Sequence, residues 1–461
     1  MKIYNDLTKR KEEFVPLDDN VVKMYACGIT TSGEAHIGHA LQAMVFDIIR
    51  KFLEKKGYEV KYARNYTDVD DKIIAKAKET GKDAMEYANE MMQKIDAVLA
   101  ELKIDAPTYL LKATENIDVI INFVSKLIEK GFAYATPEGD VYFNVEAFDG
   151  YGKLSGRNLE DVKTGTRVEL EDNKKNALDF ALWKSAKPGE IYWESPWGKG
   201  RPGWHIECSA MNYATFGEQI DIHGGGRDLL FPHHENEVAQ TEALTGKPFA
   251  KYWVHNGLVK VNGQKMSKSL NNSILVRELL EKYDAEVVRF AILQTNYRND
   301  LNITDNLFPD AEKHLTNFYQ ILSEVDALNT SKTTEANEEI NKEFDEAMED
   351  DFNMSLAIAN LFKYFKQIKA NLTANQAQAI KDANAIKQTY SLLGLFKKDP
   401  KEFLSTKQNN DVPEEVQTLA EQRWQAKKNK DFATADALRN QILELGFEIK
   451  DNKEGYDILK K

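Results

Sequence analysis

Cysteine is nearly absent from this chain, which has only Cys27 and Cys208 among its 461 residues. Two cysteines cannot build the disulfide framework of a secreted protein, so the composition favours a reducing compartment. The first residues contain no apolar core of signal-peptide length, and no run of about 18 apolar residues occurs anywhere in the sequence. We therefore expect a cytoplasmic protein with no membrane-spanning segment.

Positive charge is also in short supply. The 61 lysines and arginines are outnumbered by 74 aspartates and glutamates, so the formal net charge is −13 at pH 7. This excess of acid excludes a histone-like or polybasic protein, because it opposes nonspecific adhesion to nucleic acid or anionic lipid. It does not exclude a local basic groove. Hydrophobic residues make up 42% of the chain, which is enough for packed cores and too many for a disordered protein.

The N-terminal part alternates strand and helix patterns. Residues 21–25 predict a short strand, and apolar side chains recur at helical spacing over residues 41–53. Residues 59–64 predict the next strand. A strand, a helix and a strand in this order indicate a parallel α/β sheet. Strand-like segments and turns in residues 115–200 are interpreted as an insertion into that domain, and the second half of the chain is mainly helical in pattern.

The segment His36-Ile37-Gly38-His39 lies between the first predicted strand and its helix. Backbone N–H groups at the start of a helix favour phosphate, and Gly38 permits close approach of the backbone. The two imidazoles can donate hydrogen bonds to phosphate oxygens. The alternative is a loop with incidental surface histidines, and four residues alone leave both interpretations open.

A second candidate for binding an anion is Lys265-Met266-Ser267-Lys268-Ser269, which follows a glycine. Lysine serves phosphate as a flexible point charge, so two lysines three positions apart could clamp an anionic group. The alternative for this pentapeptide is an ordinary solvated basic turn.

Both cysteines belong to a pattern of possible metal ligands. Cys27 ends the first predicted strand, Cys208 follows a Trp-His-Ile-Glu segment, and His233 and Glu237 are one helical turn apart. Two thiolates, an imidazole and a carboxylate suit zinc. The alternatives are that the cysteines are small core residues and that the other two form an ordinary surface pair.

Taken together, these segments resemble the class I aminoacyl-tRNA synthetases. A HIGH and a KMSKS segment both match letter for letter and are about 230 residues apart. Further segments that begin at Tyr25, Asn65, Gly200 and Asp221 resemble the cysteinyl-tRNA synthetases, and this resemblance covers essentially the full chain. It implies that L-cysteine is joined to the 3′ end of tRNA(Cys) in an ATP-dependent reaction that proceeds through a cysteinyl-adenylate.

The resemblance implies four groups of site residues. The zinc ligands would be Cys27, Cys208, His233 and Glu237. ATP would be bound by His36, Gly38, His39, Lys265 and Lys268, of which the two histidines and two lysines would be catalytic. The cysteine pocket would be lined by Thr30, Thr67, Trp204 and His223. The anticodon of the tRNA would contact Arg423, Phe432, Asp436 and Arg439.

The resemblance also implies the architecture, which is a Rossmann-type α/β catalytic domain with an α+β insertion, followed by a helical bundle and a small anticodon-binding domain. The expected boundaries are 1–114 and 201–245 for the two halves of the catalytic domain, 115–200 for the connective insertion, 246–310 for a stem-contact region that carries the KMSKS segment, 311–400 for the bundle and 401–461 for the anticodon-binding domain. One Zn²⁺ per chain, Mg²⁺ with ATP, and a monomeric enzyme are expected.

Zinc would select the thiolate of cysteine. Serine differs from cysteine by one atom, and a plain pocket separates such isosteres by only about 10²-fold. A soft metal prefers thiolate to hydroxyl, so a zinc site would remove the need for an editing domain, for which residues 115–200 look too few.

The sequence departs from the family pattern around both nucleotide motifs. Residues 32–35 replace a bulky pair before HIGH, residues 40–42 lack the basic residue that is usual after it, and Asn271 replaces a common glycine. Two other functions stay open. One is the related cysteine ligase of mycothiol synthesis, which lacks the anticodon-binding end that residues 401–461 supply here. The other is a non-catalytic zinc protein that binds RNA, and the presence of both nucleotide motifs disfavours it.

Overall fold

The computed structural model describes residues 1–157, 174–266, 270, 272–410, 413–451 and 455–460. Lys268 lies outside the described residues. Two compact units make up the chain. The first unit comprises Met1–Ala311, Glu339–Phe362 and Leu392–Leu395, and the second unit comprises Glu312–Glu338, Lys363–Ser391 and Phe396–Lys461.

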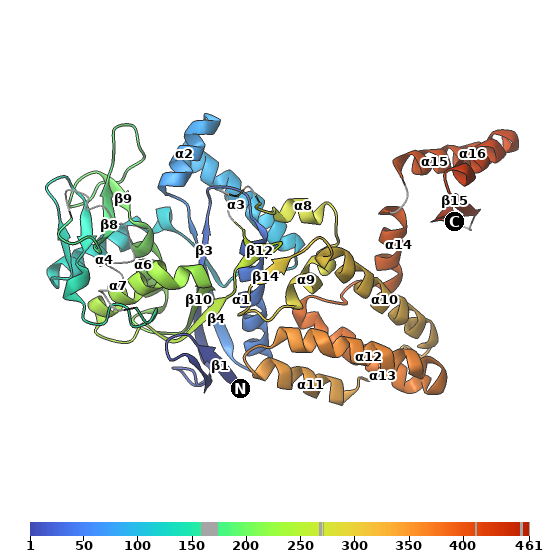
Figure 1. Cartoon of the computed structure of the whole chain (residues 1–461), viewed down its shortest axis with the longest axis horizontal. Helices are drawn as coiled ribbons and strands as arrows, with labels where there is room; N and C mark the ends of the chain where they lie inside the picture. The colour runs from blue at the N-terminus through green and yellow to red at the C-terminus, as the bar shows by residue number, and fades with distance from the viewer. Residues whose placement is uncertain (158–173, 267–269, 271, 411–412, 452–454, 461) are drawn as a thin grey trace. The chain divides into compact units, whose positions relative to one another are not determined.

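A five-stranded sheet of parallel strands is the centre of the first unit (Figure 1). Its strands, in spatial order, are β11 (Ala250–Asn256), β10 (Ile220–Gly226), β3 (Val21–Thr30), β4 (Glu59–Thr67) and β5 (Tyr109–Lys112). Successive strands from β3 to β5 run to one side, and the chain then returns to place β10 and β11 on the other. This confirms the expected Rossmann-type sheet, whose order reverses between β3 and β10. In such sheets ligands bind at the carboxyl ends of the strands at this reversal.

Helix α1 (Ile37–Lys55) connects β3 to β4. The seven apolar residues that recur at helical spacing over 41–53 are all buried. Both flanking strands are longer than their sequence patterns indicate, because β3 continues to Thr30 and β4 to Thr67. These extra residues carry the strands to the edge of the sheet where α1 begins.

The sequence between β5 and β10 forms a four-stranded antiparallel sheet with helices packed against it. Its elements are α4 (Ile117–Glu129), β6 (Ala133–Ala135), β7 (Val141–Phe143), β8 (Phe180–Ser185), β9 (Gly200–Pro202) and α6 (Trp204–Phe216). Buried side chains of α4, β7 and β8 share one core with Ile206 and Ala210 of α6 and with α7 (Glu235–Thr245). This core fixes the start of α6 against the returning catalytic domain.

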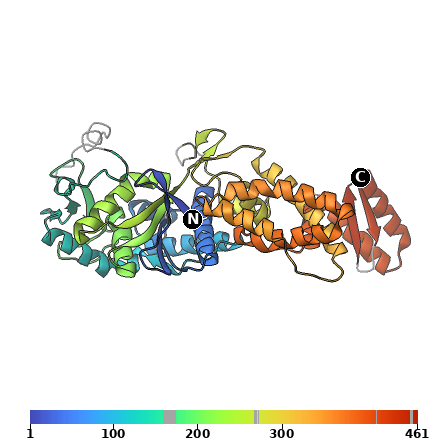
Figure 2. The same ribbon diagram turned by 90° about the horizontal axis from the view of Figure 1, so that it is seen from below.

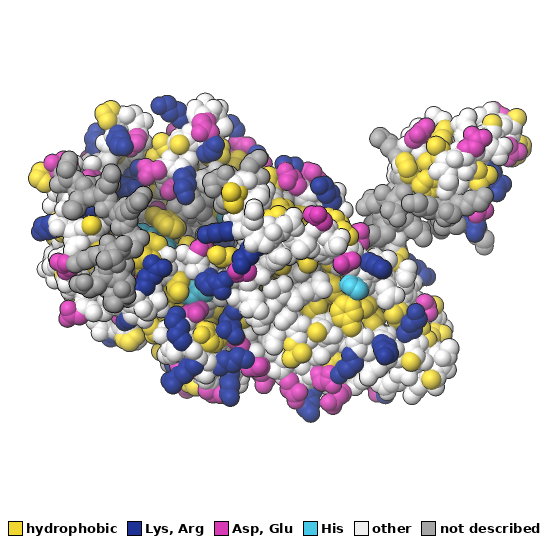
Figure 3. Space-filling view, in the orientation of Figure 1, with side chains coloured by type: hydrophobic (Ala, Val, Ile, Leu, Met, Phe, Trp, Pro, Cys, Tyr) yellow, Lys and Arg dark blue, Asp and Glu magenta, His cyan; other side chains and the backbone are white. Residues whose placement is uncertain are grey.

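The remaining elements of the first unit surround the central sheet. They are a hairpin of β1 (Lys2–Asn5) and β2 (Arg10–Glu13), the helices α2 (Asp71–Thr80) and α3 (Ala84–Glu101), a small sheet of β12 (Val259–Val261), β13 (Gln264–Lys265) and β14 (Leu301–Ile303), and the helices α8 (Val276–Leu280), α9 (Ala285–Leu293) and α11 (Glu338–Glu349). In the space-filling view, lysines and arginines are interspersed with aspartates and glutamates (Figure 3).

Beyond residue 306 the chain is mainly helical, as its sequence pattern indicates. The long helices are α10 (Leu307–Leu328), α12 (Met354–Ala374), α13 (Gln376–Tyr390) and α14 (Pro400–Asn410). The chain ends in α15 (Glu414–Lys428), α16 (Phe432–Glu444) and a hairpin of β15 (Phe447–Asp451) and β16 (Tyr456–Lys460). Figure 2 shows this hairpin beside its helices, with which it shares a small apolar core. Among the described residues, no helix combines the length and the apolar character needed to cross a bilayer.

Candidate active site

A cavity of about 400 Å³ opens where β3 and β10 end. Its walls come from the end of β3, the start of α1, the start of α6, the end of β10 and the β13 segment. Residues of the sequence motifs in its lining are Gly28, Thr30, His36, Gly38, His39, Trp204, Lys265 and Met266. The cavity lies where the strand order of the sheet reverses, which is the usual ligand site of this fold.

His36 and His39 lie at the N-terminus of α1. The backbone N–H of His36 donates a hydrogen bond to Nδ1 of His39 at 3.3 Å, and the two rings stack with their centroids 3.6 Å apart. A Cβ added at Gly38 would lie 3.1 Å from the ring of His36 and 3.7 Å from the terminal methyl carbon of Met266. Gly38 thus leaves room for the ring of His36, and it lies beside Met266 although the two motif segments are far apart in the sequence.

Lys265 ends β13 and is exposed at the mouth of this cavity. The backbone N–H of Met266 donates to the carbonyl of Val259 at 3.0 Å, which ties the start of the KMSKS segment to β12. The structure thus brings Lys265 to the cavity that the two histidines line. The roles assigned to Lys265, Lys268 and the histidines stay predictions.

A buried cluster of sulfur, nitrogen and oxygen atoms lies beside the cavity. The donor atoms of Cys27, Cys208, His233 and Glu237 all lie within 4.8 Å of one another. Sγ of Cys27 donates to Oε1 of Glu237 at 3.0 Å, and Nε2 of His233 lies 3.1 Å from the same oxygen. Cys27 comes from β3, Cys208 from α6, His233 from the turn before α7 and Glu237 from α7, so only the fold assembles them.

A second set of donors overlaps the first. The donor atoms of Cys27, His223, His234 and Glu237 also lie within 4.8 Å of one another, and all four residues are buried, so this cluster could hold a metal ion. Sequence reasoning placed His223 in the cysteine pocket and missed His234. The only signal for His234 in the sequence is its position next to His233.

The cluster carries charges that need compensation. Burial by itself raises the pKa of Glu237, but His223 and His233 hold that pKa well below its ordinary value. Interactions with Cys27 and with His233 outweigh burial and lower the pKa of Cys208 to about 6. Burial opposes protonation of His233, yet the charges of Glu237 and Cys208 raise its pKa to about 10. A carboxylate and a thiolate are thus held close to one protonated ring, which is an arrangement that a divalent cation can replace.

The four residues predicted for the cysteine pocket fall in two places. Thr30 and Trp204 line the cavity. Thr67 is buried, and its hydroxyl donates to Oε2 of Glu207 at 2.7 Å. His223 belongs to the metal cluster, because its Nε2 lies 3.1 Å from Oε2 of Glu237.

Trp204 connects the cavity to the cluster. Its side chain is 40% exposed, and its ring stacks on the ring of His233 with a centroid distance of 4.3 Å. A small molecule in the cavity can therefore contact Trp204 on one side while it reaches toward the buried donors.

Sequence reasoning missed several residues of the cavity wall. The side-chain amide of Gln42 donates to the carbonyl of Cys27 and accepts the N–H of Gly226 at 3.1 Å. Gln42 thereby bridges β3 and β10 where the two strands separate. Lys72 and Asp228 also line the cavity. Nothing in their local sequence pattern indicates which way these side chains face.

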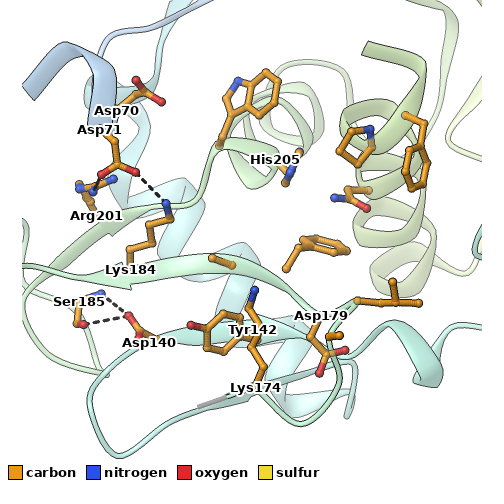
Figure 4. A pocket seen from close by; sticks show the side chains of 18 of the residues that line it. Asp70, Asp71, Asp140, Tyr142, Lys174, Asp179, Lys184, Ser185, Arg201 and His205 are labelled. Atoms are coloured by element: carbon orange, nitrogen blue, oxygen red, sulfur yellow. Dashed lines mark hydrogen bonds and ion pairs between the residues drawn. The ribbon is translucent and has the colours of Figure 1, made fainter. Parts of the chain in front are cut away.

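A larger cavity of about 820 Å³ adjoins the first, since Trp204 lines both. Figure 4 shows that its wall combines charged side chains with aromatic rings. Nζ of Lys184 lies 3.0 Å from Oδ2 of Asp71, and Arg201 donates to the other oxygen of the same carboxylate. His205 also lines this cavity (Figure 4), and its Nδ1 lies 2.9 Å from Nδ1 of His233.

The residues assigned to the anticodon differ in exposure. Phe432, Asp436 and Arg439 are all exposed on α16, and their spacing places them on one face of the helix. Arg423 is 3% exposed, and its guanidinium donates to both carboxylate oxygens of Asp451 at 2.8 and 3.0 Å. The contact of Arg423 with RNA stays a prediction, and the geometry shows that this side chain ties α15 to β15.

Replacement of Arg423 by alanine is expected to destabilise the C-terminal helices and hairpin by about 1–3 kcal/mol, because it removes two charged hydrogen bonds. Arg423 lowers the pKa of Asp451 well below its ordinary value. This pair therefore stabilises the fold above the ordinary aspartate pKa of about 4, and its contribution is lost as the pH falls through the lowered value. Hydrogen exchange of residues 413–451 at pH 7 measures the loss of stability, and the difference between wild type and variant should shrink progressively as the pH falls below about 4.

The matched control for this prediction is Arg439→Ala, which removes an exposed arginine from α16. It should leave the exchange rates unchanged and weaken only RNA binding. Equal exchange rates in both variants at pH 7 would contradict the structural role of Arg423.

Comparisons with known proteins agree along the whole chain. Residues 13–313 match the family described as the tRNA synthetases class I (C) catalytic domain, residues 343–397 match the DALR domain, and residues 409–456 match the cysteinyl-tRNA ligase anticodon binding domain. The chain is 45% identical to the cysteine–tRNA ligase of Geobacter sp. (strain M21), over 99% of this chain and 98% of the relative. It is 48% identical to the cysteine–tRNA ligase of Carboxydothermus hydrogenoformans, over 99% of each.

Solved structures with much lower identity share the fold. The methionyl-tRNA synthetase of Mycobacterium tuberculosis in complex with methionyl-adenylate superposes with a TM-score of 0.61 at 13% identity, over 84% of this chain and 93% of that one. The LeuRS of Agrobacterium radiobacter K84, in a ternary complex, also has a TM-score of 0.61, at 12% identity and over 86% of each chain. The chain therefore belongs to the cysteine–tRNA ligases, a family of class I aminoacyl-tRNA synthetases.

Proposed function

We propose that this enzyme activates L-cysteine with ATP to form cysteinyl-adenylate and then transfers the cysteinyl group to the 3′ end of tRNA(Cys). The observation that supports this most is that the HIGH histidines and Lys265 line the same cavity, which reaches the buried cysteine–histidine–glutamate cluster through Trp204. One substrate can thus present its carboxylate to ATP while its side chain reaches the cluster.

In the first step, a carboxylate oxygen of cysteine attacks the α-phosphorus of ATP. A new P–O bond forms, the bond to the β-phosphate oxygen breaks, and pyrophosphate leaves with its electron pair. Catalysis of such a step needs positioned charges and hydrogen-bond donors rather than a covalent nucleophile. The rings of His36 and His39 and the start of α1 supply donors, and Lys265 and Lys268 supply positive charge. ATP would enter as its Mg²⁺ complex.

In the second step, a ribose hydroxyl of the terminal adenosine of the tRNA attacks the acyl carbon of the adenylate. The ester bond to the ribose forms, the bond to AMP breaks, and the hydroxyl proton is released. The enzyme forms no covalent intermediate with the amino acid. Its contribution is to hold the two reacting groups together and to exclude water.

The residues that would hold zinc are Cys27, Cys208, His233 and Glu237. Three observations support the fit. The donor set is two sulfurs, one imidazole nitrogen and one carboxylate oxygen, all buried. The pKa of Cys208 is lowered to about 6, so a thiolate is available. The raised pKa of His233 indicates that a proton on this ring compensates the negative charges of Glu237 and Cys208, and a bound cation could take the place of that proton. Bound zinc would supply a preference for the thiolate of cysteine over the hydroxyl of serine.

The C-terminal segment would bind the anticodon through the exposed face of α16, with Phe432 available for stacking on a base. With a net charge of −13, the chain as a whole repels RNA, so affinity must come from local lysines and arginines and must fall as salt rises.

Two measurements on the purified enzyme test the proposed function. Exchange of pyrophosphate into ATP should depend on cysteine, and charging of tRNA(Cys) should follow. Exchange without charging would favour a cysteine ligase that acts on another acceptor, such as the ligase of mycothiol synthesis. Absence of both would favour a protein that binds RNA without catalysis. Transcripts with a changed anticodon are the matched control, because they should lose charging while exchange stays the same.

A further inference from the structure

A chain of hydrogen bonds links the N-terminal hairpin to the metal cluster. Oδ2 of Asp6 lies 2.8 Å from Nδ1 of His255, and Nε2 of His255 lies 2.8 Å from Nδ1 of His234. Asp6 directly follows β1, His255 belongs to β11, and His234 precedes α7. His234 is in turn one of the second set of possible metal ligands, together with His223 and Glu237.

The carboxylate determines the direction of these hydrogen bonds. An ionised carboxylate can only accept, so Nδ1 of His255 donates to Asp6. A neutral imidazole carries one proton, so Nε2 of His255 accepts the N–H of His234 Nδ1. Nε2 of His234 is then left with a lone pair.

The lone pair of His234 faces the cluster. Nε2 of His234 is buried and has no hydrogen-bond partner in the described part of the chain, and Oε1 of Glu237 lies 3.9 Å away. The T-shaped contact between the rings of His234 and His223 has a centroid distance of 4.9 Å. An acceptor nitrogen opposite a carboxylate is unfavourable unless a cation or a hydrogen-bond donor lies between them.

Asp6 is held firmly enough to act in this way. Its backbone N–H donates to the carbonyl of Trp253 at 2.9 Å. The side chain of the preceding Asn5 accepts the N–H of Trp253 at 3.0 Å and donates to the carbonyl of Lys251 at 3.0 Å. These three hydrogen bonds hold the end of β1 against β11. The carboxylate of Asp6 therefore lies beside His255 because of how the two strands are joined.

We propose that Asp6 and His255 are positioning residues of the metal centre, which hold His234 as the Nδ1–H tautomer so that Nε2 presents an electron pair to the space beside Cys27 and Glu237. This inference rests on the proposed metal site and adds to it the nitrogen of His234, which belongs to the second donor set that shares Cys27 and Glu237. Histidines at metal sites are commonly oriented by a partner on the other ring nitrogen, and the loss of such a partner costs about 10–100-fold in metal affinity.

The test uses Co²⁺ alone as the probe, added to the metal-free full-length protein, because its visible absorption reports on the ligands. Asp6→Ala and His255→Phe are expected to weaken Co²⁺ binding by about 10–100-fold. His255→Gln should retain most of the affinity, since its amide can still accept from His234 and donate to Asp6. In a His234→Ala background, His255→Phe should cost nothing further, because His255 acts only through His234.

The matched control is Tyr252→Phe. The hydroxyl of Tyr252 donates to the carbonyl of Glu13 at 2.8 Å, so it fastens the same hairpin to β11 without touching the histidines. This variant should bind Co²⁺ like the wild type.

The outcomes separate the inference from the metal site on which it rests. Unchanged Co²⁺ affinity in folded His255→Phe and Asp6→Ala proteins would overturn the inference and leave the metal site standing. Equal weakening in Tyr252→Phe would also overturn it, because a loosened hairpin would then explain the loss. Failure of the wild type to bind Co²⁺ would instead reject the metal site, and the inference with it. If His255→Phe does not fold, Asp6→Ala and His255→Gln decide the question.

Discussion

Replacing Cys208 by serine is expected to release the metal and to lower cysteine-dependent pyrophosphate exchange by at least about 100-fold, because a direct ligand contributes more than the outer partners whose loss costs 10–100-fold. The discrimination against serine should fall to about 10²-fold or less, which is what a pocket without a metal achieves between isosteres. Metal content of the purified protein and the ratio of cysteine-dependent to serine-dependent exchange measure both effects.

Two further variants make this result specific. Glu237→Gln keeps the shape of the side chain and removes its charge, so it should lose metal and discrimination in the same way. Ser209→Ala changes the next residue of α6, which is buried and accepts a hydrogen bond from Gln240 at 2.9 Å, and it should keep both. If serine is still strongly rejected by metal-free Cys208→Ser protein, the metal does not select the substrate.

Replacing His36 or Lys265 by alanine is expected to lower the rate constant of cysteine-dependent exchange by about 10²–10³-fold, the usual cost of removing one donor to a developing negative charge. The KM for cysteine should change little, because neither side chain belongs to the metal cluster or to the stacked pair of Trp204 and His233. Steady-state exchange at varied ATP and cysteine concentrations separates kcat from KM.

The matched control is Lys260→Ala. Lys260 lies opposite Lys265 in the pairing of β12 with β13, and its ammonium group forms an ion pair with Asp300 at 2.9 Å. This variant removes a neighbouring positive charge without altering the lining of the cavity, so its exchange rate should stay close to that of the wild type. A raised KM for ATP with unchanged kcat in Lys265→Ala would show that this lysine binds ground state and transition state equally, which contradicts a catalytic role.

The central part of the fold could be predicted from local patterns. The spacing of seven apolar residues over 41–53 predicts the buried face of α1, and all seven are buried. The adjoining strand patterns predict β3 and β4, and the order of strand, helix and strand predicts their parallel pairing. These features depend on residues that are close in the sequence. The sequence pattern misses the ends of β3 and β4. Gly28 interrupts the apolar pattern of β3, and the end of β4 carries the polar residues Asn65 and Thr67, which are buried in the fold.

The candidate site could be predicted much less well from local patterns, because its prediction needed the resemblance to a family and its geometry needed the fold. Composition alone could not separate two ligands from two small core residues, since Cys27 and Cys208 are buried in either case. The place of His223 in the cysteine pocket stays a prediction, and the structure adds a contact of this residue with Glu237 that the sequence does not indicate. The contact of Arg423 with the anticodon likewise stays a prediction, and its pairing with Asp451 is visible only in the structure. The sequence alone does not show whether a charged side chain faces solvent or pairs with another side chain of the protein.

Both cysteines of the chain lie in the buried cluster of possible metal ligands. The sequence alone determined the α/β fold, the two nucleotide-binding motifs and the family to which they belong. Periodicity and short motifs are local properties, so they can be recognised without the fold. Which donors meet was decided only by the folded chain. Five of the eight histidines contact one another around Glu237, and one of them is linked to Asp6, because β10, β11 and the start of α7 converge at one end of the sheet. Such convergence depends on contacts between residues up to 249 positions apart, as between Asp6 and His255, and no local pattern encodes it.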